Sequence, residues 1–175
     1  MEIQTSAPKQ LNYNQFQLYS LITLRVLIGW HFLYEGISKL TNPYWSSAAF
    51  LMESKWIFSG WAQSIISEPV LVTVVDYLNM WGLTAIGLGL ICGCFSRWAS
   101  IAGMVLLGLY YITNPPFIGL QYSSPTEGSY MIVNKNLIEM CALYVLTVFP
   151  TSAIIGIDQL IFKRNPSEKS GDNNE

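Results

Sequence analysis

Long apolar runs decide which folds are open to this chain. Segments 70–90 and 99–112 contain one charged residue between them, and segment 137–149 contains only Glu139. A helix that crosses a bilayer needs roughly 20 residues, or about 17 at the short end. The sequence therefore predicts four membrane spans, over residues 16–39, 70–94, 97–113 and 131–149.

The composition agrees with a membrane protein. Only 11% of the residues are charged and 51% are hydrophobic, whereas about 25% of a soluble domain is charged. The competing interpretation is a soluble helical bundle with very apolar helices. The formal charge of −2 provides no basic surface, which argues against nucleic acid as a partner. We expect an all-α integral membrane protein embedded in the lipid bilayer. It would be a four-helix transmembrane bundle in one domain, 16–162, between polar tails 1–15 and 163–175.

Charged residues outside the spans predict the topology. Four spans place both termini on one side, with Lys9, Arg97, Lys163, Arg164 and Lys169, against Lys39, Lys55 and Lys135 on the other. The positive-inside rule then favours cytoplasmic termini in a multi-pass cell (inner) membrane protein. The polar N-terminal segment lacks the basic n-region of a signal peptide. We therefore expect the first span to stay in the mature protein.

The first outer segment, 41–69, is rich in aromatic residues, including Tyr44, Trp45, Trp56 and Trp61. Trp and Tyr settle at headgroup depth, and an amphipathic helix can lie flat there. We expect an interfacial helix that covers the outer mouth of the bundle, with simple membrane anchoring as the alternative. Within the second span, the stripe of Gly82, Gly89 and Gly93 predicts close helix packing.

Ionisable and amide side chains gather toward the outer ends of the spans. His31, Glu35 and Lys39 are spaced i, i+4 and i+8, so they share one helix face. Asp76 and Asn79 lie in the outer half of the second span, and Asn136 and Glu139 open the fourth. A charge at the bilayer centre costs about 2.5–3.5 kcal/mol on insertion scales, so such groups usually pair or line a wet cavity. We therefore predict one shared polar site, although interfacial ion pairs such as Glu35–Lys39 would explain part of the pattern. Arg25 lies deeper and has no obvious acidic partner.

Three stretches resemble the DoxX family, and more closely its DoxD-like branch. They are "LRVLIGWHFLYEGISKL", "NMWGLTAIGLGLICGCFSRWASIAGMVLL" and "NKNLIEMCALYVLTVFP" followed by "GIDQLIF". DoxD-like proteins are the membrane subunit of thiosulfate:quinone oxidoreductase and work beside a DoxA subunit. The resemblance implies a four-helix membrane protein that passes electrons from a partner or small substrate to quinone.

Residue chemistry allows that function and leaves others open. His31 and Glu35 are the candidate catalytic residues, because imidazole and carboxylate can relay protons near neutral pH. The candidate substrate-binding residues are Lys39, Asp76, Asn79, Asn136 and Glu139. A single histidine and the lack of a Gly-rich phosphate loop give no support for bis-histidine haem, a flavin or a metal. The alternatives are a non-enzymatic anchor or scaffold for a soluble oxidoreductase and, third, transport of a small solute. Whether the chain is itself an enzyme, and whether it forms a homo-oligomer, stays open.

Overall fold

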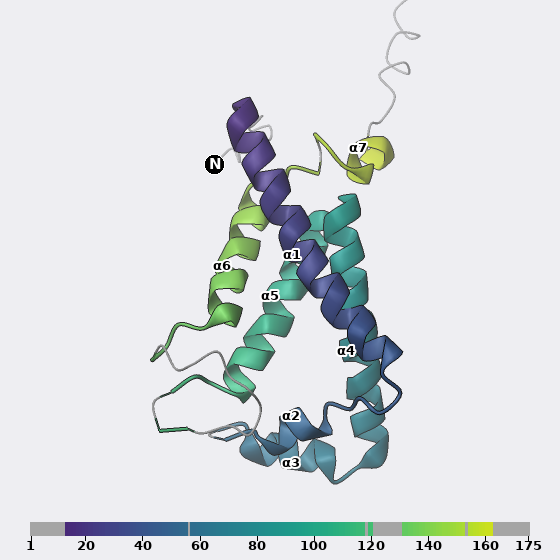
Figure 1. Cartoon of the computed structure of the whole chain (residues 1–175), viewed down its shortest axis with the longest axis vertical. Coiled ribbons are helices and arrows are strands. Elements are labelled where there is room, and N and C mark those ends of the chain that lie inside the picture. The colour runs from purple at the N-terminus through teal and green to yellow at the C-terminus, as the bar shows by residue number, and fades with distance from the viewer. Residues whose placement is uncertain (1–12, 56, 118, 121–130, 153, 163–175) are drawn as a thin grey trace, which may run out of the picture.

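The computed structural model describes residues 13–55, 57–117, 119–120, 131–152 and 154–162. Most of the predicted N-terminal tail and all of the C-terminal tail lie outside these ranges. The regular elements within them are helices, which confirms the all-α prediction (Figure 1). They are α1 (Gln15–Thr41), α2 (Ala48–Met52), α3 (Ser59–Ile66), α4 (Pro69–Cys92), α5 (Ser96–Thr113), α6 (Lys135–Val148) and α7 (Ile157–Phe162).

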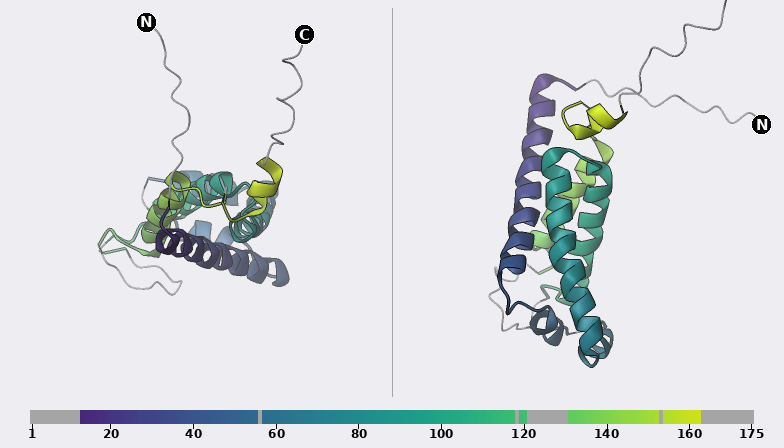
Figure 2. Two further views of the ribbon diagram at one scale, coloured as in Figure 1. Left: turned by 90° about the horizontal axis from the view of Figure 1, so that it is seen from above. Right: turned by 90° about the vertical axis from the view of Figure 1, so that its right-hand side faces the viewer.

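The four longest helices run roughly along one direction and alternate in sense (Figure 1). α1 packs against α4, α5 packs against α6, and α4 also contacts α5. The two short helices α2 and α3 lie across one end, and α7 lies at the other end together with the start of α1 (Figure 2). We call these the α2–α3 end and the α7 end of the molecule.

Two helices have the length and apolar character of a membrane span. α1 has 27 residues and α4 has 24, and only 28% of the most apolar window of each is buried inside the protein. A core helix of a soluble protein would be buried over most of its length. The outward surface of α1 instead carries Leu27, Trp30 and Tyr34, each 62% exposed. Such a surface suits the hydrocarbon of a bilayer.

The last long helix is shorter than the sequence predicted. α6 begins at Lys135, not at Met131, because the side chain of Asn134 accepts a hydrogen bond from the backbone N–H of Leu137 at 3.0 Å. This is an N-cap, which fixes the first turn of a helix. α6 therefore has 14 residues, fewer than the roughly 17 that a straight span requires.

Close contact between α1 and α4 depends on different glycines from those predicted. A Cβ atom added at Gly87 would lie 2.7 Å from the Cα of Leu33, and one at Gly36 would lie 2.6 Å from the backbone N of Thr84. Gly82 has nothing within 4 Å of such an atom, so its predicted packing role was wrong. Phe32, Leu90 and Leu143 are almost completely buried and form the centre of the core.

Hydrogen bonds fasten the α2–α3 end to the long helices. The carboxylate of Asp76 in α4 accepts from the backbone N–H of Ser47 at 2.7 Å and from its hydroxyl at 2.5 Å. The Ser54 hydroxyl donates to the Thr113 carbonyl at 3.3 Å, at the end of α5. The segment predicted to hold one interfacial helix thus forms two short ones, and its depth in the bilayer stays a prediction.

A second set of bonds fastens the α7 end. Arg25 of α1 is 4% exposed and donates to the Thr151 hydroxyl at 3.1 Å and to the Ile155 carbonyl at 2.9 Å. Asp158 accepts from the backbone N–H groups of Phe95 at 2.7 Å and Ser96 at 3.4 Å, where a carboxylate complements the start of α5. We call Arg25, Thr151, Ile155 and Asp158 the Arg25 cluster. It holds the segment after α6 against the α4–α5 turn.

Candidate functional site

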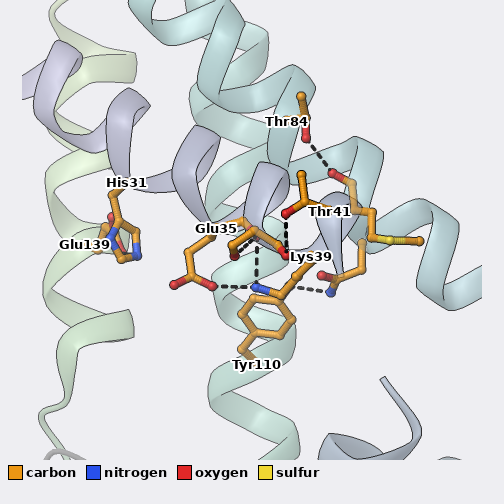
Figure 3. Close-up of polar contacts among 10 residues, drawn as sticks. His31, Glu35, Lys39, Thr41, Thr84, Tyr110 and Glu139 are labelled. Atoms are coloured by element: carbon orange, nitrogen blue, oxygen red, sulfur yellow. Dashed lines mark hydrogen bonds and ion pairs between the residues drawn. The ribbon is translucent and has the colours of Figure 1, made fainter. Parts of the chain in front are cut away.

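One pair of predicted residues meets between α1 and α6. The His31 Nε2 atom lies 3.8 Å from the Glu139 Oε2 atom, and Figure 3 shows the two side chains facing each other across the helices. The side chain of Glu139 is 11% exposed and that of His31 is 37% exposed. This pair therefore lies at the margin of the protein interior, where one partner is sheltered and the other is accessible.

The sheltered carboxylate has an unused oxygen. Glu139 Oε2 is buried and makes no hydrogen bond within the described residues, and its distance to His31 Nε2 is longer than a hydrogen bond. A buried acceptor without a donor costs about 1–3 kcal/mol, and more when it is charged. A proton, a water molecule or the donor of a ligand at this oxygen would remove that cost.

A tighter ion pair lies one turn further along α1. The Lys39 ammonium is 2.5 Å from Glu35 Oε2 and also reaches the Glu35 carbonyl at 3.4 Å. It lies 5.6 Å from the centre of the Trp45 ring, a distance suited to a cation–π contact. The Glu35 side chain is 41% exposed, and both His31 and Lys135 are close enough to act on it electrostatically. Glu35 thus links the Lys39 pair to the His31–Glu139 pair.

Tyr110 of α5 also belongs to this region, although it is not among the catalytic and substrate-binding residues predicted from the sequence. Its hydroxyl accepts a hydrogen bond from the side-chain amide of Asn79 in α4, and it lies close to the Glu35–Lys39 pair (Figure 3). Phe50 packs edge-on against its ring at 5.6 Å between centroids. The Asn79 Oδ1 atom is buried and without a hydrogen-bond partner among the described residues. A tyrosine within an apolar helix was the available signal, because a buried phenol needs a partner for its hydroxyl.

Two other predicted residues have different surroundings. The Asp76 carboxylate accepts both hydrogen bonds from Ser47, so it holds the segment between α1 and α2 against α4. Asn136 is half-buried in the first turn of α6, and the described hydrogen bonds do not join it to the other predicted residues. The polar groups therefore form a core of His31, Glu35, Lys39, Asn79, Tyr110 and Glu139, which we call the polar cluster.

The chemistry open to the polar cluster is the holding and transfer of protons. It combines an imidazole, two carboxylates, an ammonium group, a phenol and an amide on the four helices α1, α4, α5 and α6. Among the residues that the structure describes, no three His, Cys, Asp or Glu side chains are grouped to hold a metal ion. Cys92, Cys94 and Cys141 are free thiols.

Comparison with known proteins gives one match. The family model described as DoxX matches residues 20–114, slightly more than half of the chain. The match contains most of α1 and all of α2, α3, α4 and α5, with His31, Glu35, Lys39, Asn79 and Tyr110, and ends before Glu139. No curated protein and no solved structure matches the chain.

Proposed function

This chain belongs to the DoxX family of membrane proteins, and we propose that it is the membrane subunit of a redox system. In this proposal it is DoxD-like, crosses the cell (inner) membrane four times, with the 14 residues of α6 forming only part of the fourth crossing, and has cytoplasmic termini. It passes electrons from a partner subunit or a small substrate to quinone, and the polar cluster is the place where protons are exchanged.

The observation that carries the proposal is the His31–Glu139 pair, with a buried carboxylate oxygen that lacks a donor. Quinone, when bound, would take up two electrons and two protons. His31 would present a proton at Nε2, and Glu139 would hold or return it. Glu35, one turn from His31, would exchange protons with the accessible side of the cluster. Each step is a proton transfer between neighbouring groups near neutral pH.

The residues present fit a quinone in kind. Its two carbonyl oxygens need donors, and the cluster offers the imidazole of His31 and the ammonium group of Lys39. The reduced form carries hydroxyl groups, for which the unpartnered acceptors of Asn79 and Glu139 are suited. The exposed rings of Trp30 and Tyr34 would lie beside an apolar ring and tail in the bilayer.

Reconstitution into vesicles with a DoxA-like partner, thiosulfate and a short-chain quinone tests this function. We expect His31→Ala and Glu139→Gln to lower the rate of quinone reduction by about 10²–10⁴-fold, the usual contribution of a positioned acid or base. Glu68→Gln, an exposed carboxylate at the start of α4, is the matched control and should keep the wild-type rate. Yield and melting temperature would be measured on all variants. Wild-type rates in His31→Ala and Glu139→Gln would contradict the proposal.

The same measurements would identify the alternative function. An anchor or scaffold for a soluble oxidoreductase needs the outward apolar surfaces but no proton exchange in the cluster. In that case the variants would lose yield or partner association, while the activity per assembled complex would stay at the wild-type value. Transport of a small solute remains a third function, predicted from the sequence alone.

A further inference from the structure

Two amide oxygens toward the α2–α3 end are buried without a hydrogen-bond donor. Asn79 of α4 is 9% exposed, and its Oδ1 atom has no partner among the described residues. The Oδ1 atom of Asn114, the residue directly after α5, is buried and unpartnered in the same sense. Buried polar atoms of native proteins are nearly all hydrogen-bonded, either to the protein or to ordered water. These two oxygens therefore mark a place where a group outside the described chain donates hydrogen bonds.

The Tyr110 side chain connects the two amides. Its hydroxyl oxygen accepts from the Asn79 amide N–H, so the phenol hydrogen is left for another acceptor, and no described residue supplies one. The backbone N–H of Asn114 donates to the Tyr110 carbonyl at 3.1 Å, which places the two residues one turn apart along α5. Phe50 of α2 contacts both, because its carbonyl accepts from the Asn114 amide at 3.4 Å and its ring centroid lies 5.6 Å from that of Tyr110. Together Asn79, Asn114 and Tyr110 offer two unused acceptors and one unused donor.

Water is the molecule whose hydrogen-bonding capacity matches these groups. It donates two hydrogen bonds and accepts others, and a buried water typically makes about three. Donation to the two amide oxygens and acceptance from the phenol would use every unused group. A cation would use the oxygens but would leave the phenol hydrogen without an acceptor, and it would lie near the Lys39 ammonium group (Figure 3).

These groups extend from the end of the bundle to the polar cluster. Asn114 lies where α5 ends, in contact with Phe50 of α2. One turn further into the bundle, Tyr110 lies close to the Glu35–Lys39 pair (Figure 3). A chain of water molecules can carry protons between groups that do not touch. The line from Asn114 to Glu35 is therefore suited to proton movement between the α2–α3 end and the cluster.

We propose that Asn114, Tyr110 and Asn79 hold a chain of water molecules through which Glu35 exchanges protons with the solution at the α2–α3 end. The inference rests on the proposed function, because it supplies the protons that the polar cluster passes to quinone. The three residues belong to α4 and to α5 with its C-cap, so this route is separate from the His31–Glu139 pair on α1 and α6. They are positioning residues, since they orient water and do not touch the reacting atoms.

A crystal structure of the full chain that resolves ordered water tests the site without any redox assay. We expect water oxygens within hydrogen-bond distance of the Oδ1 atoms of both Asn79 and Asn114 in the wild type. Asn79→Leu keeps the side-chain size but removes the polar atoms, so the water beside Tyr110 should be lost. Density for an organic molecule at these oxygens, or none at all, would overturn the proposal.

Quinone reduction in reconstituted vesicles tests the route. We expect Asn79→Leu and Asn114→Leu each to lower the rate about tenfold, the effect of losing roughly one hydrogen bond from the rate-limiting step. Because proton delivery would then limit turnover, the rate should fall further in D2O than it does for the wild type. Added imidazole, a small proton carrier, should restore part of the rate.

Asn42→Leu is the matched control. The Asn42 side chain is exposed at the end of α1 and its oxygen accepts from the Tyr44 backbone N–H at 3.1 Å, so this variant should keep the wild-type rate. Wild-type rates in Asn79→Leu and Asn114→Leu, alongside an inactive His31→Ala, would overturn the water route and leave the proposed function standing. A loss of rate with no added isotope effect and no rescue by imidazole would assign the amides a structural role and also overturn it. If the wild type reduced no quinone, the proposed function would fail, and the crystallographic water positions would still decide the site.

Discussion

Arg25 is a charged side chain inside an apolar helix, and its surroundings explain how the helix keeps it. The guanidinium is buried and donates to Thr151 and Ile155, while Asp158 lies close enough to act on it electrostatically. Removing a charge from water is expensive unless hydrogen bonds and an opposite charge replace the lost solvation. Arg25 therefore joins the first long helix to the last segment of the described chain.

We expect Arg25→Lys to destabilise the folded protein, because a single ammonium group cannot reproduce the two directions of the guanidinium. Loss of one hydrogen bond to a charged group corresponds to about 1.5–3 kcal/mol. Thermal unfolding in detergent would show it as a lower melting temperature. Arg97→Lys, an exposed site, is the control and should melt like the wild type. An Arg25→Lys variant as stable as this control would show that the cluster contributes little.

Side-chain spacing within one helix was readable from the sequence. His31 and Glu139 were also expected in one polar region, where they lie 3.8 Å apart, but most individual partners across long separations were not readable. The i, i+4 rule brought Glu35 and Lys39 together correctly. Arg25 had no predictable partner, because it binds a backbone carbonyl and a hydroxyl in an irregular segment 126 to 130 residues away. The Asn79–Tyr110 hydrogen bond was missed for a related reason. It depends on the rotation of α4 and α5 about their own axes. When a helix is apolar on all sides, its sequence does not show which side faces its neighbour.

Among the elements, the contact between α1 and α4 is the most sensitive to side-chain volume. At Gly87, an added Cβ would meet the Cα of Leu33 and the Gly29 carbonyl, both at 2.7 Å. These are backbone atoms, so they cannot move aside without shifting a whole helix. The contact therefore requires the absence of a side chain at this position.

Gly87→Ala should destabilise the protein by about 1–3 kcal/mol, the usual effect of overpacking in a core. Gly82→Ala is the matched control in the same helix. Its new methyl group meets nothing within 4 Å, so the better helix propensity of Ala should stabilise by up to about 1 kcal/mol. Unfolding in denaturant would measure the change in the free energy of unfolding for each variant, which should be a decrease for Gly87→Ala and an increase for Gly82→Ala. Equal effects at the two positions would contradict the packing assigned to Gly87.

The predicted helix boundaries agreed with the structure where capping residues were clear, and they were wrong where a capping residue was overlooked. α4 begins at Pro69, a residue favoured in the first turn, and ends at Cys92, directly before Gly93, which adopts φ 64°. The predicted start of the last span at 131 ignored Asn134, whose side chain caps α6. The glycine stripe of α4 predicted close packing correctly at Gly89, which faces Ala99 of α5, and at Gly93, which faces Gly156, but wrongly at Gly82. Spacing shows which glycines share a face, and only the structure shows which face meets α1.

In the molecule as a whole, the two clusters of polar side chains lie toward opposite ends of the long helices. Lys39 of the polar cluster is in the last turn of α1, which leads to the α2–α3 end, whereas Arg25 bonds to the segment that leads to α7 at the other end (Figure 1). The start of α1, the α4–α5 turn and α7 are together at that second end (Figure 2). If this arrangement crosses a bilayer, the polar cluster and the Arg25 cluster belong to opposite leaflets.

The charge distribution then predicts which leaflet is which. Arg97 follows the α4–α5 turn at the α7 end, and Lys163 and Arg164 come next in the sequence after α7, so the positive-inside rule predicts a cytoplasmic location for this end. We expect Ser67→Cys, an exposed position between α3 and α4, to react with a membrane-impermeant maleimide in intact cells. The background would be a variant with Cys92, Cys94 and Cys141 replaced by alanine. A cysteine at Arg97 in the same background is the control and should react only after the membrane is permeabilised. If Arg97→Cys were labelled in intact cells and Ser67→Cys were protected, the orientation would be inverted, and the polar cluster would exchange its protons with the cytoplasm.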